Sequence, residues 1–379
     1  MEDLILQQTD LTLRRSDLAI EVVEQFIGNA SGKKSGIVKE ENQVGQLKVT
    51  CIDVLKGYEQ KTGKEAGRYI SIDTSKMGLD SVDKLEETRA VFSEELQKIL
   101  AYKKIAPDAT CLIVGLGNEH ITPDALGPMV LDNIIVTRHL YELADRQETE
   151  NHLKNENHLK NDWGNFEGDY RKVSALAPGV MGLTGIETYD IIESVVGKIK
   201  PDFLIVVDAL AARAVSRVNK MIQMTDTGIS PGSGVGNKRR RIDEKSLGIP
   251  VIAVGIPTVV DAVSVTHDTI DLLLKHIEQS LLEKENNRFG SEPSVNHRQN
   301  GVDDWEENLP NEAIRKEFLG KIGMLSKEEK RQLLAEVLTP AGYNLIVTPK
   351  TIDSEIEDLS RLVSNALNVA LHPNIEFAV

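Results

Sequence analysis

The sequence predicts an α/β protein whose mostly parallel, twisted sheet is flanked by helices. Apolar strand patterns alternate with helical patterns after residue 108: 111–116 with 124–137, 202–208 with a helix from about 210, and 250–255 with 264–283. Such alternation places parallel strands in one sheet with helices on both faces. Two of these strands also deliver an aspartate, Asp124 and Asp208, to the carboxyl ends where open α/β sheets bind ligands.

The flanking regions predict an N-terminal β-rich portion and a C-terminal helical extension. Alternating apolar and polar residues indicate strands of a half-buried antiparallel sheet at 36–39, 47–54 and 68–74. Helical spacing of apolar residues predicts helices at 18–28, 84–102, 326–338 and 353–371.

Composition excludes several classes of protein. The 379 residues carry a formal net charge of −15, which argues against nucleic acid or an anionic membrane as the main partner. No apolar run reaches the roughly 18 residues of a membrane span, and the N-terminus lacks the apolar stretch of a signal peptide. The two cysteines form no CxxC pattern. We therefore expect a soluble cytoplasmic protein.

Two glycine-rich motifs invite a nucleotide or anion-binding interpretation. Gly115-Leu-Gly117 follows a strand, but His120 stands where the third glycine of a dinucleotide fingerprint belongs, and no Walker A pattern occurs. The second motif, 232–241, combines glycines with a basic tail. It is either a loop that cradles an anion through backbone N–H groups or a flexible loop with solvated charges.

The two strand-associated aspartates are the main catalytic candidates. A pair of carboxylates whose pKa values are pushed apart can act as acid and base in hydrolysis. Asp124 and Asp208 have a structural alternative as helix N-caps. His267 follows a third strand, so an Asp-Asp-His metal site is a further alternative. No G-x-S-x-G nucleophile elbow is present.

Taken in order, these motifs resemble the germination proteases of spore-forming bacteria. The segments that carry the resemblance are 115–128, 178–188, 207–213, 226–238 and 255–263. The resemblance implies a cytoplasmic endopeptidase of the spore core that starts the breakdown of small acid-soluble spore proteins. It also implies an inactive homotetrameric zymogen, activated by loss of a propeptide, with a core similar to that of hydrogenase maturation proteases.

The resemblance places Asp124 and Asp208 at the catalytic acidic positions and implies aspartic-type hydrolysis without a cofactor. The alternatives are a nickel- or zinc-dependent maturation-type peptidase with Asp124, Asp208 and His267 as ligands, and a non-catalytic α/β binding protein. The expected segments are a propeptide at 1–17, a β-rich segment at 18–107, a catalytic core at 108–283 with a polar insertion at 145–172, and an extension at 284–379.

The resemblance further implies cleavage after an acidic residue that is followed by an apolar residue and Ala. Arg213 and Lys238 are the candidate cations for that acidic side chain. The N-terminal run Asp17-Leu18-Ala19 matches the same pattern, so we expect activation by cleavage of the Asp17–Leu18 bond, with acidification as a trigger. The alternative is that Asp17 caps the helix that follows.

Overall fold

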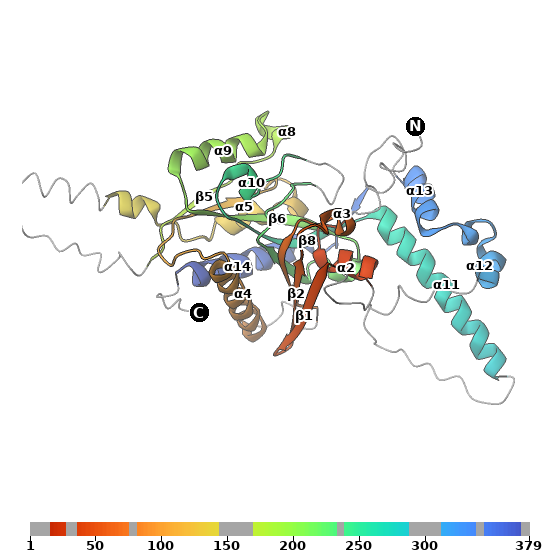
Figure 1. Cartoon of the computed structure of the whole chain (residues 1–379). Coiled ribbons are helices and arrows are strands. Elements are labelled where there is room, and N and C mark those ends of the chain that lie inside the picture. Colours follow the sequence, from red (N-terminus) through yellow and green to blue (C-terminus); the bar gives the residue numbers. More distant parts are fainter. Residues whose placement is uncertain are drawn as a thin grey trace, which may run out of the picture. The chain divides into compact units, whose positions relative to one another are not determined.

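The structure is a computed structural model and describes residues 16–27, 36–75, 82–143, 170–232, 239–287, 312–338 and 345–372 (Figure 1). The imperfect repeat at 151–162 and Lys238 lie outside these residues. The chain forms two compact units. The larger contains the described residues of Ser16–Ala212, Arg217–Val259 and Thr348–Val379, and the smaller contains those of Arg213–Ser216 and Val260–Val347.

One large sheet organises the larger unit, with strand order β1-β2-β3-β7-β8-β6-β4-β5. The strands are β1 (Ile37–Val44), β2 (Leu47–Val54), β3 (Gly67–Asp73), β4 (Cys111–Gly115), β5 (Val173–Leu176), β6 (Phe203–Ala212), β7 (Met221–Thr225) and β8 (Val251–Asp261).

The mixed α/β class is confirmed, but the predicted predominance of parallel strands is wrong. β4 pairs in parallel with β5 and β6, whereas β1–β2, β2–β3, β3–β7 and β7–β8 are antiparallel. The N-terminal hairpin explains part of this, because β1 and β2 are joined by a tight turn with Gly45 at φ +58°. A two-residue connection of this kind permits only antiparallel pairing.

Helices cover both faces of the sheet. Against one face pack α4 (Val82–Tyr102), α5 (Leu126–Leu131) and α14 (Ile352–Leu371), which share a core with Cys111 and Ile113. The intervening residues Leu112 and Val114 point to the opposite core, under α9 (Thr188–Ile199) (Figure 1). This period of two matches a strand that is buried on both sides. Shorter helices of this unit are α2 (Ala19–Ile27), α3 (Glu59–Thr62), α8 (Met181–Thr184), α10 (Glu244–Leu247) and the 3-10 turn η1 (Thr122–Asp124).

The smaller unit is mainly helical. It contains α11 (Ala262–Asn287), α12 (Glu312–Leu319), the 3-10 turn η5 (Ile322–Met324) and α13 (Lys327–Leu338), and α11 contacts both α12 and α13. The short strand β9 (Ile346–Val347) pairs antiparallel with Val260 and Asp261. The Asp261 carboxylate accepts from the backbone N–H of Ser264 at 3.1 Å, which secures the first turn of α11.

The predicted helices at 18–28, 84–102, 326–338 and 353–371 are confirmed as α2, α4, α13 and α14. The helix predicted from about 210 is wrong, because β6 continues to Ala212 and leads only to the 3-10 turn η2 (Val215–Arg217). The helix predicted at 124–137 is shortened to α5. The run Ala209–Ala212 favours a helix by propensity, and strand pairing overrides that weak preference.

Candidate active site

The turn after β4 fixes the position of Asp124. Gly117 has φ +113°, and a Cβ added there would lie 1.9 Å from the carbonyl oxygen of Asp124. This closeness lets the backbone N–H of Asn118 donate to the carbonyl oxygen of Asp124 at 3.1 Å and to its Oδ2 at 2.9 Å. Only glycine combines this φ with this approach, so Gly117 is required by the geometry of the turn.

A second pair of glycines brings the Asp124 segment against β6. A Cβ on Gly115 would meet the Gly127 carbonyl oxygen at 2.3 Å, and one on Gly127 would meet the Val207 carbonyl oxygen at 2.7 Å. The start of α5 therefore lies directly on the end of β4 and on the residue before Asp208. These contacts explain how residues 84 positions apart in the sequence come to share one site.

Asp208 lies within β6 and is buried, with 7% of its surface exposed. Its Oδ1 accepts from the backbone N–H of Ala209 at 3.0 Å. Burial raises the pKa of Asp208 well above its ordinary value, and the charges of Asp124 and Asp17 raise it further. Asp124 also has a raised pKa because of burial, an effect opposed by the Asn118 N–H and the charge of Arg239. The structure thus brings the carboxyls of Asp17, Asp124 and Asp208 near one another, and the pKa values of Asp124 and Asp208 are both raised.

Neither catalytic candidate caps a helix. The residue that precedes α5 in the capping position is Ala125, while Asp124 ends the 3-10 turn η1, and Asp208 lies in the middle of a strand. The capping alternative for these two residues is therefore wrong. A carboxylate buried in a strand without a helix terminus to stabilise costs free energy, and perturbed carboxyls of this kind cluster at functional sites.

The segment that begins at Ser16 pairs with the end of β6. The Asp17 N–H donates to the Ala211 carbonyl oxygen at 3.0 Å, and the Ala211 N–H donates to Asp17 Oδ2 at 2.9 Å. Asp17 is thereby placed three residues along the strand from Asp208. Its carboxylate accepts from the strand N–H of Ala211.

The peptide unit between Asp17 and Leu18 is held from the other side as well. The carbonyl oxygen of Asp17 accepts from Lys64 Nζ at 2.8 Å and from Gln223 Nε2 at 3.0 Å. Gln223 Oε1 in turn accepts from the Ala19 N–H at 2.6 Å. Leu18 and Ala19 are both fully buried at 0% exposure. The segment is therefore hydrogen-bonded on each side of a single peptide bond, directly before α2 begins at Ala19.

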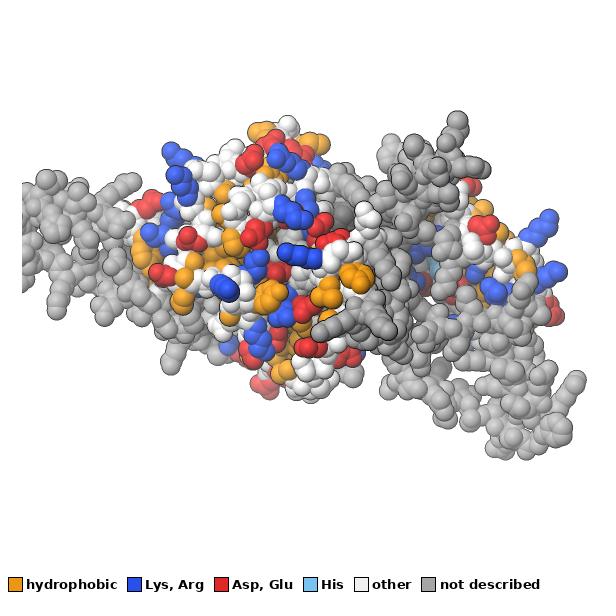
Figure 2. All heavy atoms as spheres, in the orientation of Figure 1, with side chains coloured by type: hydrophobic (Ala, Val, Ile, Leu, Met, Phe, Trp, Pro, Cys, Tyr) orange, Lys and Arg blue, Asp and Glu red, His pale blue; other side chains and the backbone are white. Residues whose placement is uncertain are grey.

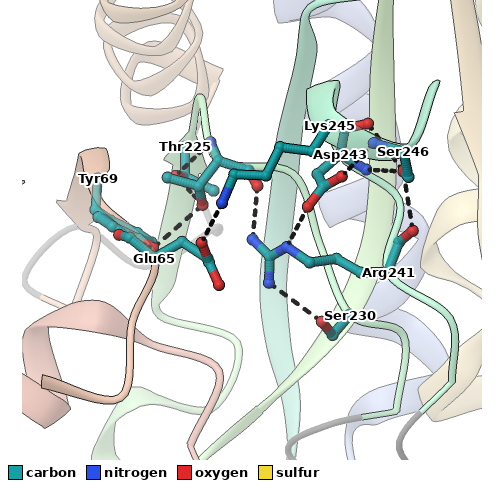
Figure 3. Close-up of polar contacts among 9 residues, drawn as sticks. Glu65, Tyr69, Thr225, Ser230, Arg241, Asp243, Lys245 and Ser246 are labelled. Atoms are coloured by element: carbon teal, nitrogen blue, oxygen red, sulfur yellow. Dashed lines mark hydrogen bonds and ion pairs between the residues drawn. The ribbon is translucent and has the colours of Figure 1, made fainter. Parts of the chain in front are cut away.

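A cavity of about 470 Å³ opens beside this segment, with Asp17, Lys64 and Gln223 among its lining residues. Arg241 also lines it, and its guanidinium donates to Asp243 at 2.8 Å, to Ser230 at 3.2 Å and to the Thr227 carbonyl oxygen at 2.6 Å (Figure 3). These contacts hold one cationic group rigidly against the cavity. The cavity therefore offers room for a further stretch of peptide, with charged side chains of both signs in its lining.

The other candidates from the sequence occupy different places. Arg213 lies in the smaller unit, where its Nη2 is 3.2 Å from Asp268 Oδ1. His267 is buried in α11, with its Nδ1 3.5 Å from the same carboxylate of Asp268. Lys238 lies outside the described residues. Within the described ranges, no three His, Cys, Asp or Glu side chains are grouped so as to hold a metal ion.

Two polar residues of the site escape sequence reasoning. Lys64 comes from the connection between α3 and β3, and Gln223 from the middle of β7. Neither lies in a glycine-rich or strand-end pattern of the kind that reveals Asp124. The signal that finds them is the sheet register, in which Ser71 of β3 is opposite Gln223.

Charges of both signs are interspersed on the visible face of the larger unit (Figure 2). This distribution accompanies the net charge of −15. Among the helices that the structure describes, none is long and apolar enough to cross a membrane.

Comparison with known proteins shows which family the chain is similar to. The model of the germination protease family matches residues 14–378. The chain is 46% identical over 366 residues to a germination protease of Bacillus velezensis, an alignment that covers 96% of this chain and 94% of the relative. It is 44% identical to the germination proteases of Bacillus subtilis and Priestia megaterium, over 374 and 375 residues, with 96% and 97% of this chain and 94% of each relative covered.

Proposed function

This chain belongs to the germination protease family and is an endopeptidase of spore germination; from that premise we propose an aspartic-type hydrolysis in which Asp208 is the acid and Asp124 the base. Its substrates are small acid-soluble spore proteins in the spore core, and the enzyme is made as a homotetrameric zymogen. The core resembles that of hydrogenase maturation proteases. The location of the carboxyls and the mode of binding of residues 16–19 support this proposal.

The unequal surroundings of the two carboxyls support the assignment of roles. Asp208 is the more buried and its pKa is raised by two neighbouring carboxylates, so it retains its proton. Asp124 is half-buried and receives the Asn118 N–H, which stabilises its ionised form. In the reaction, Asp124 takes a proton from water while the water oxygen attacks the carbonyl carbon. Asp208 donates its proton to the leaving nitrogen as the C–N bond breaks and the carbonyl double bond re-forms, and loss of the proton that Asp124 took from water returns the pair to its starting state.

One observation carries the zymogen part of the proposal: the carbonyl of the Asp17–Leu18 bond is held by Lys64 and Gln223, while the Asp17 side chain lies near Asp208. Asp17 is close enough to Asp208 for its charge to raise the pKa of Asp208. A segment attached to the enzyme competes effectively for its own site because its local concentration is high. Residues 1–17 are thus a built-in substrate, and occupation of the site by this segment keeps the zymogen inactive.

Acidification is the proposed trigger. Asp17, Asp124 and Asp208 place three carboxyls in one buried region, and their mutual repulsion is relieved by protons. Lower pH therefore increases the population in which Asp208 carries the proton that the leaving group needs. It also weakens any ionic contact that the Asp17 carboxylate makes.

The test is to incubate the full-length protein at mildly acidic pH and to sequence the new N-terminus. A mature chain that begins at Leu18 and then cleaves a spore-protein substrate is the expected result. The Asp208→Asn protein, treated identically, should stay intact, which controls for a contaminating peptidase. A mature chain that begins elsewhere, or an intact chain with full activity, would overturn the zymogen proposal. If a strong chelator abolishes the activity and nickel or zinc restores it, the aspartic-type assignment is wrong.

A further inference from the structure

We infer that Lys64 and Gln223 form the oxyanion-binding site of this peptidase and act directly on the carbonyl oxygen of the bond that is cut. This inference rests on the proposed cleavage between Asp17 and Leu18, and adds two catalytic residues to it. The carbonyl oxygen of that bond accepts from Lys64 Nζ at 2.8 Å and from Gln223 Nε2 at 3.0 Å.

The geometry suits a group that stabilises developing negative charge. Both donor distances lie within the range of about 2.7–3.1 Å that oxyanion-binding donors adopt. When water adds to the carbonyl carbon, the oxygen gains negative charge, and its hydrogen bond to an ammonium strengthens more than one to a neutral donor. The interaction is thus stronger in the transition state than in the bound substrate, which is the condition for a contribution to the rate.

Lys64 is held in place by more than the scissile carbonyl. Its Nζ also donates to the Ser16 carbonyl oxygen at 3.2 Å. Burial lowers the pKa of Lys64, an effect that Asp17 and Glu21 oppose and Arg241 reinforces. Placing an ammonium against two backbone carbonyls costs desolvation free energy. A neutral donor would satisfy these carbonyls at a smaller cost, so stability alone does not account for a lysine here.

Gln223 has a second role that fixes the register of the substrate. While its Nε2 binds the carbonyl of Asp17, its Oε1 accepts from the N–H of Ala19. One side chain thereby spans the bond to be cut, from the carbonyl of Asp17 to the residue at which α2 begins. Gln223 is itself only 6% exposed on β7, so the amide is held by the sheet.

The same arrangement assigns the recognition of the acidic residue before the cut. The carboxylate of Asp17 accepts from the N–H of Ala211, a donor that belongs to the strand backbone. A peptide substrate that replaces the N-terminal segment would bind this N–H with the side chain of its acidic residue. The backbone carbonyl oxygen of the same residue would accept from Lys64 and Gln223. The ligand class is therefore a peptide with an acidic, then an apolar, then a small residue.

The experiment measures the rate of self-cleavage of the full-length chain, in which the substrate is already bound. We expect Lys64→Ala to slow cleavage by about 10²–10³-fold, the loss typical for one oxyanion donor. Lys64→Arg should recover much of that loss because a guanidinium still donates and remains charged. Gln223→Leu should cause a smaller loss, since its donor is neutral.

The matched control is Lys245→Ala. Lys245 is also a lysine near this cavity, but its side chain is 83% exposed and pairs with Glu65 at 3.1 Å (Figure 3). Its removal should leave the rate unchanged. Thermal unfolding of each variant, measured in parallel, shows whether a slow rate reflects chemistry or loss of folded protein.

Chemical rescue separates catalysis from packing. Propylammonium replaces the atoms that Lys64→Ala removes, and the adjoining cavity of about 470 Å³ admits it. We expect the rate of the Lys64→Ala chain to rise with propylammonium concentration but not with propanol, which has the same length and no charge. Equal rescue by propanol, or a Lys64→Ala rate equal to that of the unmodified chain, would overturn the inference.

Failure of the inference is distinguishable from failure of the proposed function. If the unmodified chain cleaves at Asp17–Leu18 and Asp208→Asn does not, the proposed function stands, and a normal Lys64→Ala rate counts against the oxyanion site alone. If the unmodified chain cleaves elsewhere, both are overturned.

Discussion

In the parallel half of the sheet, where β4 lies between β5 and β6, the side chains of the site are the carboxyls of Asp124 and Asp208. In the antiparallel half, where β7 lies between β3 and β8, the site side chains Lys64 and Gln223 are hydrogen-bond donors. The segment at Asp17 connects the two halves, since it contacts β6 through its N–H and β7 through its carbonyl oxygen. In the proposed mechanism, proton transfer and carbonyl binding are thus supplied by parts of the protein that differ in topology.

This division has a structural logic. A parallel strand leaves the sheet through a loop at its carboxyl end, and the segment after β4 presents Asp124 in this way, whereas Asp208 lies within β6 itself. The antiparallel strands instead offer side chains from their middle, which adjacent strands hold rigidly. Gln223 is fixed in this way by its pairing with Ser71 on one side and Gly255 on the other.

The largest expected effect separates the two halves directly. Asp124→Asn and Asp208→Asn should each reduce peptidase activity by about 10³-fold or more, because each removes a group that transfers a proton. The matched control is Asp226→Asn in the antiparallel half. Asp226 also has a pKa raised by burial, but its Oδ1 only accepts the Arg68 N–H at 2.7 Å, a contact that asparagine keeps. Comparable losses in all three variants would contradict the division. Activity on a synthetic peptide and the unfolding midpoint provide the measurement.

A second comparison uses glycines with positive φ from each half. Gly117→Ala in the β4 turn should lower activity by about 10²-fold, because a small displacement of a catalytic group has costs of this size. Its Cβ would lie 1.9 Å from the Asp124 carbonyl oxygen. Gly57, which follows β2, also has a positive φ, of 90°, but a Cβ added there would have no atom within 4 Å. The control variant is therefore Gly57→Ala. It should reduce stability without changing kcat, and an equal fall in kcat for both would argue against a special role of the turn.

Shortening the buried side chain of Leu18, in the segment that joins the two halves of the sheet, should lower the stability of the folded chain. Leu18 is fully buried, so Leu18→Ala should lower the free energy of unfolding of the full-length chain by about 2–5 kcal/mol. Denaturant titration measures this. The control is Leu183→Ala, because Leu183 is 61% exposed. This variant should leave the free energy of unfolding almost unchanged. A loss below about 0.5 kcal/mol for Leu18→Ala would mean that the segment contributes little to the folded state.

The smallest effect concerns the helix α14 behind the parallel half. His372 at its end is buried and accepts the Arg171 N–H at 3.1 Å, and burial lowers its pKa to about 4. The folded protein therefore binds fewer protons than the unfolded chain between about pH 6.5 and 4, and stability from His372 falls as the pH drops through this window. The loss is at most roughly 3 kcal/mol, at about 1.4 kcal/mol for each pH unit. His372→Gln should remove this part of the pH dependence of unfolding, and an unchanged profile would show that His372 does not titrate as described.

Part of this architecture follows from local sequence pattern. Periodicity alone predicts α4 and α14, and the run Cys111–Gly115 is apolar throughout, which is typical of a strand buried on both faces. The pattern at 115–128 also locates Asp124 correctly beside the end of β4. These predictions succeed because they depend on residues that are neighbours in sequence.

The remainder depends on contacts between distant segments. The extension of β6 through Ala212 cannot be read from Ala209–Ala212, because the residue that pairs there, Asp17, is almost 200 positions away. Lys64 and Gln223 become partners of one carbonyl oxygen only through the β3–β7 register. The mixed strand direction of the sheet likewise follows from β7, which pairs antiparallel with both β3 and β8.

The depth at which Leu18 lies has a consequence for the reversibility of activation. Hydrolysis of the Asp17–Leu18 bond would turn one neutral amide into a new ammonium and a new carboxylate, at a residue that is now fully buried. Glu21, only 3% exposed, accepts the Ser16 hydroxyl, which also accepts the Leu18 N–H at 3.1 Å. Departure of Ser16 with the released piece would remove the hydroxyl that donates to the Glu21 carboxylate and would leave the new Leu18 ammonium near that carboxylate, which Arg217 also approaches at 3.6 Å. Opposite charges attract strongly in a buried environment, so the proposed cleavage would give the mature chain an internal ion pair that the uncut chain could not form, and this pair would oppose the reverse reaction.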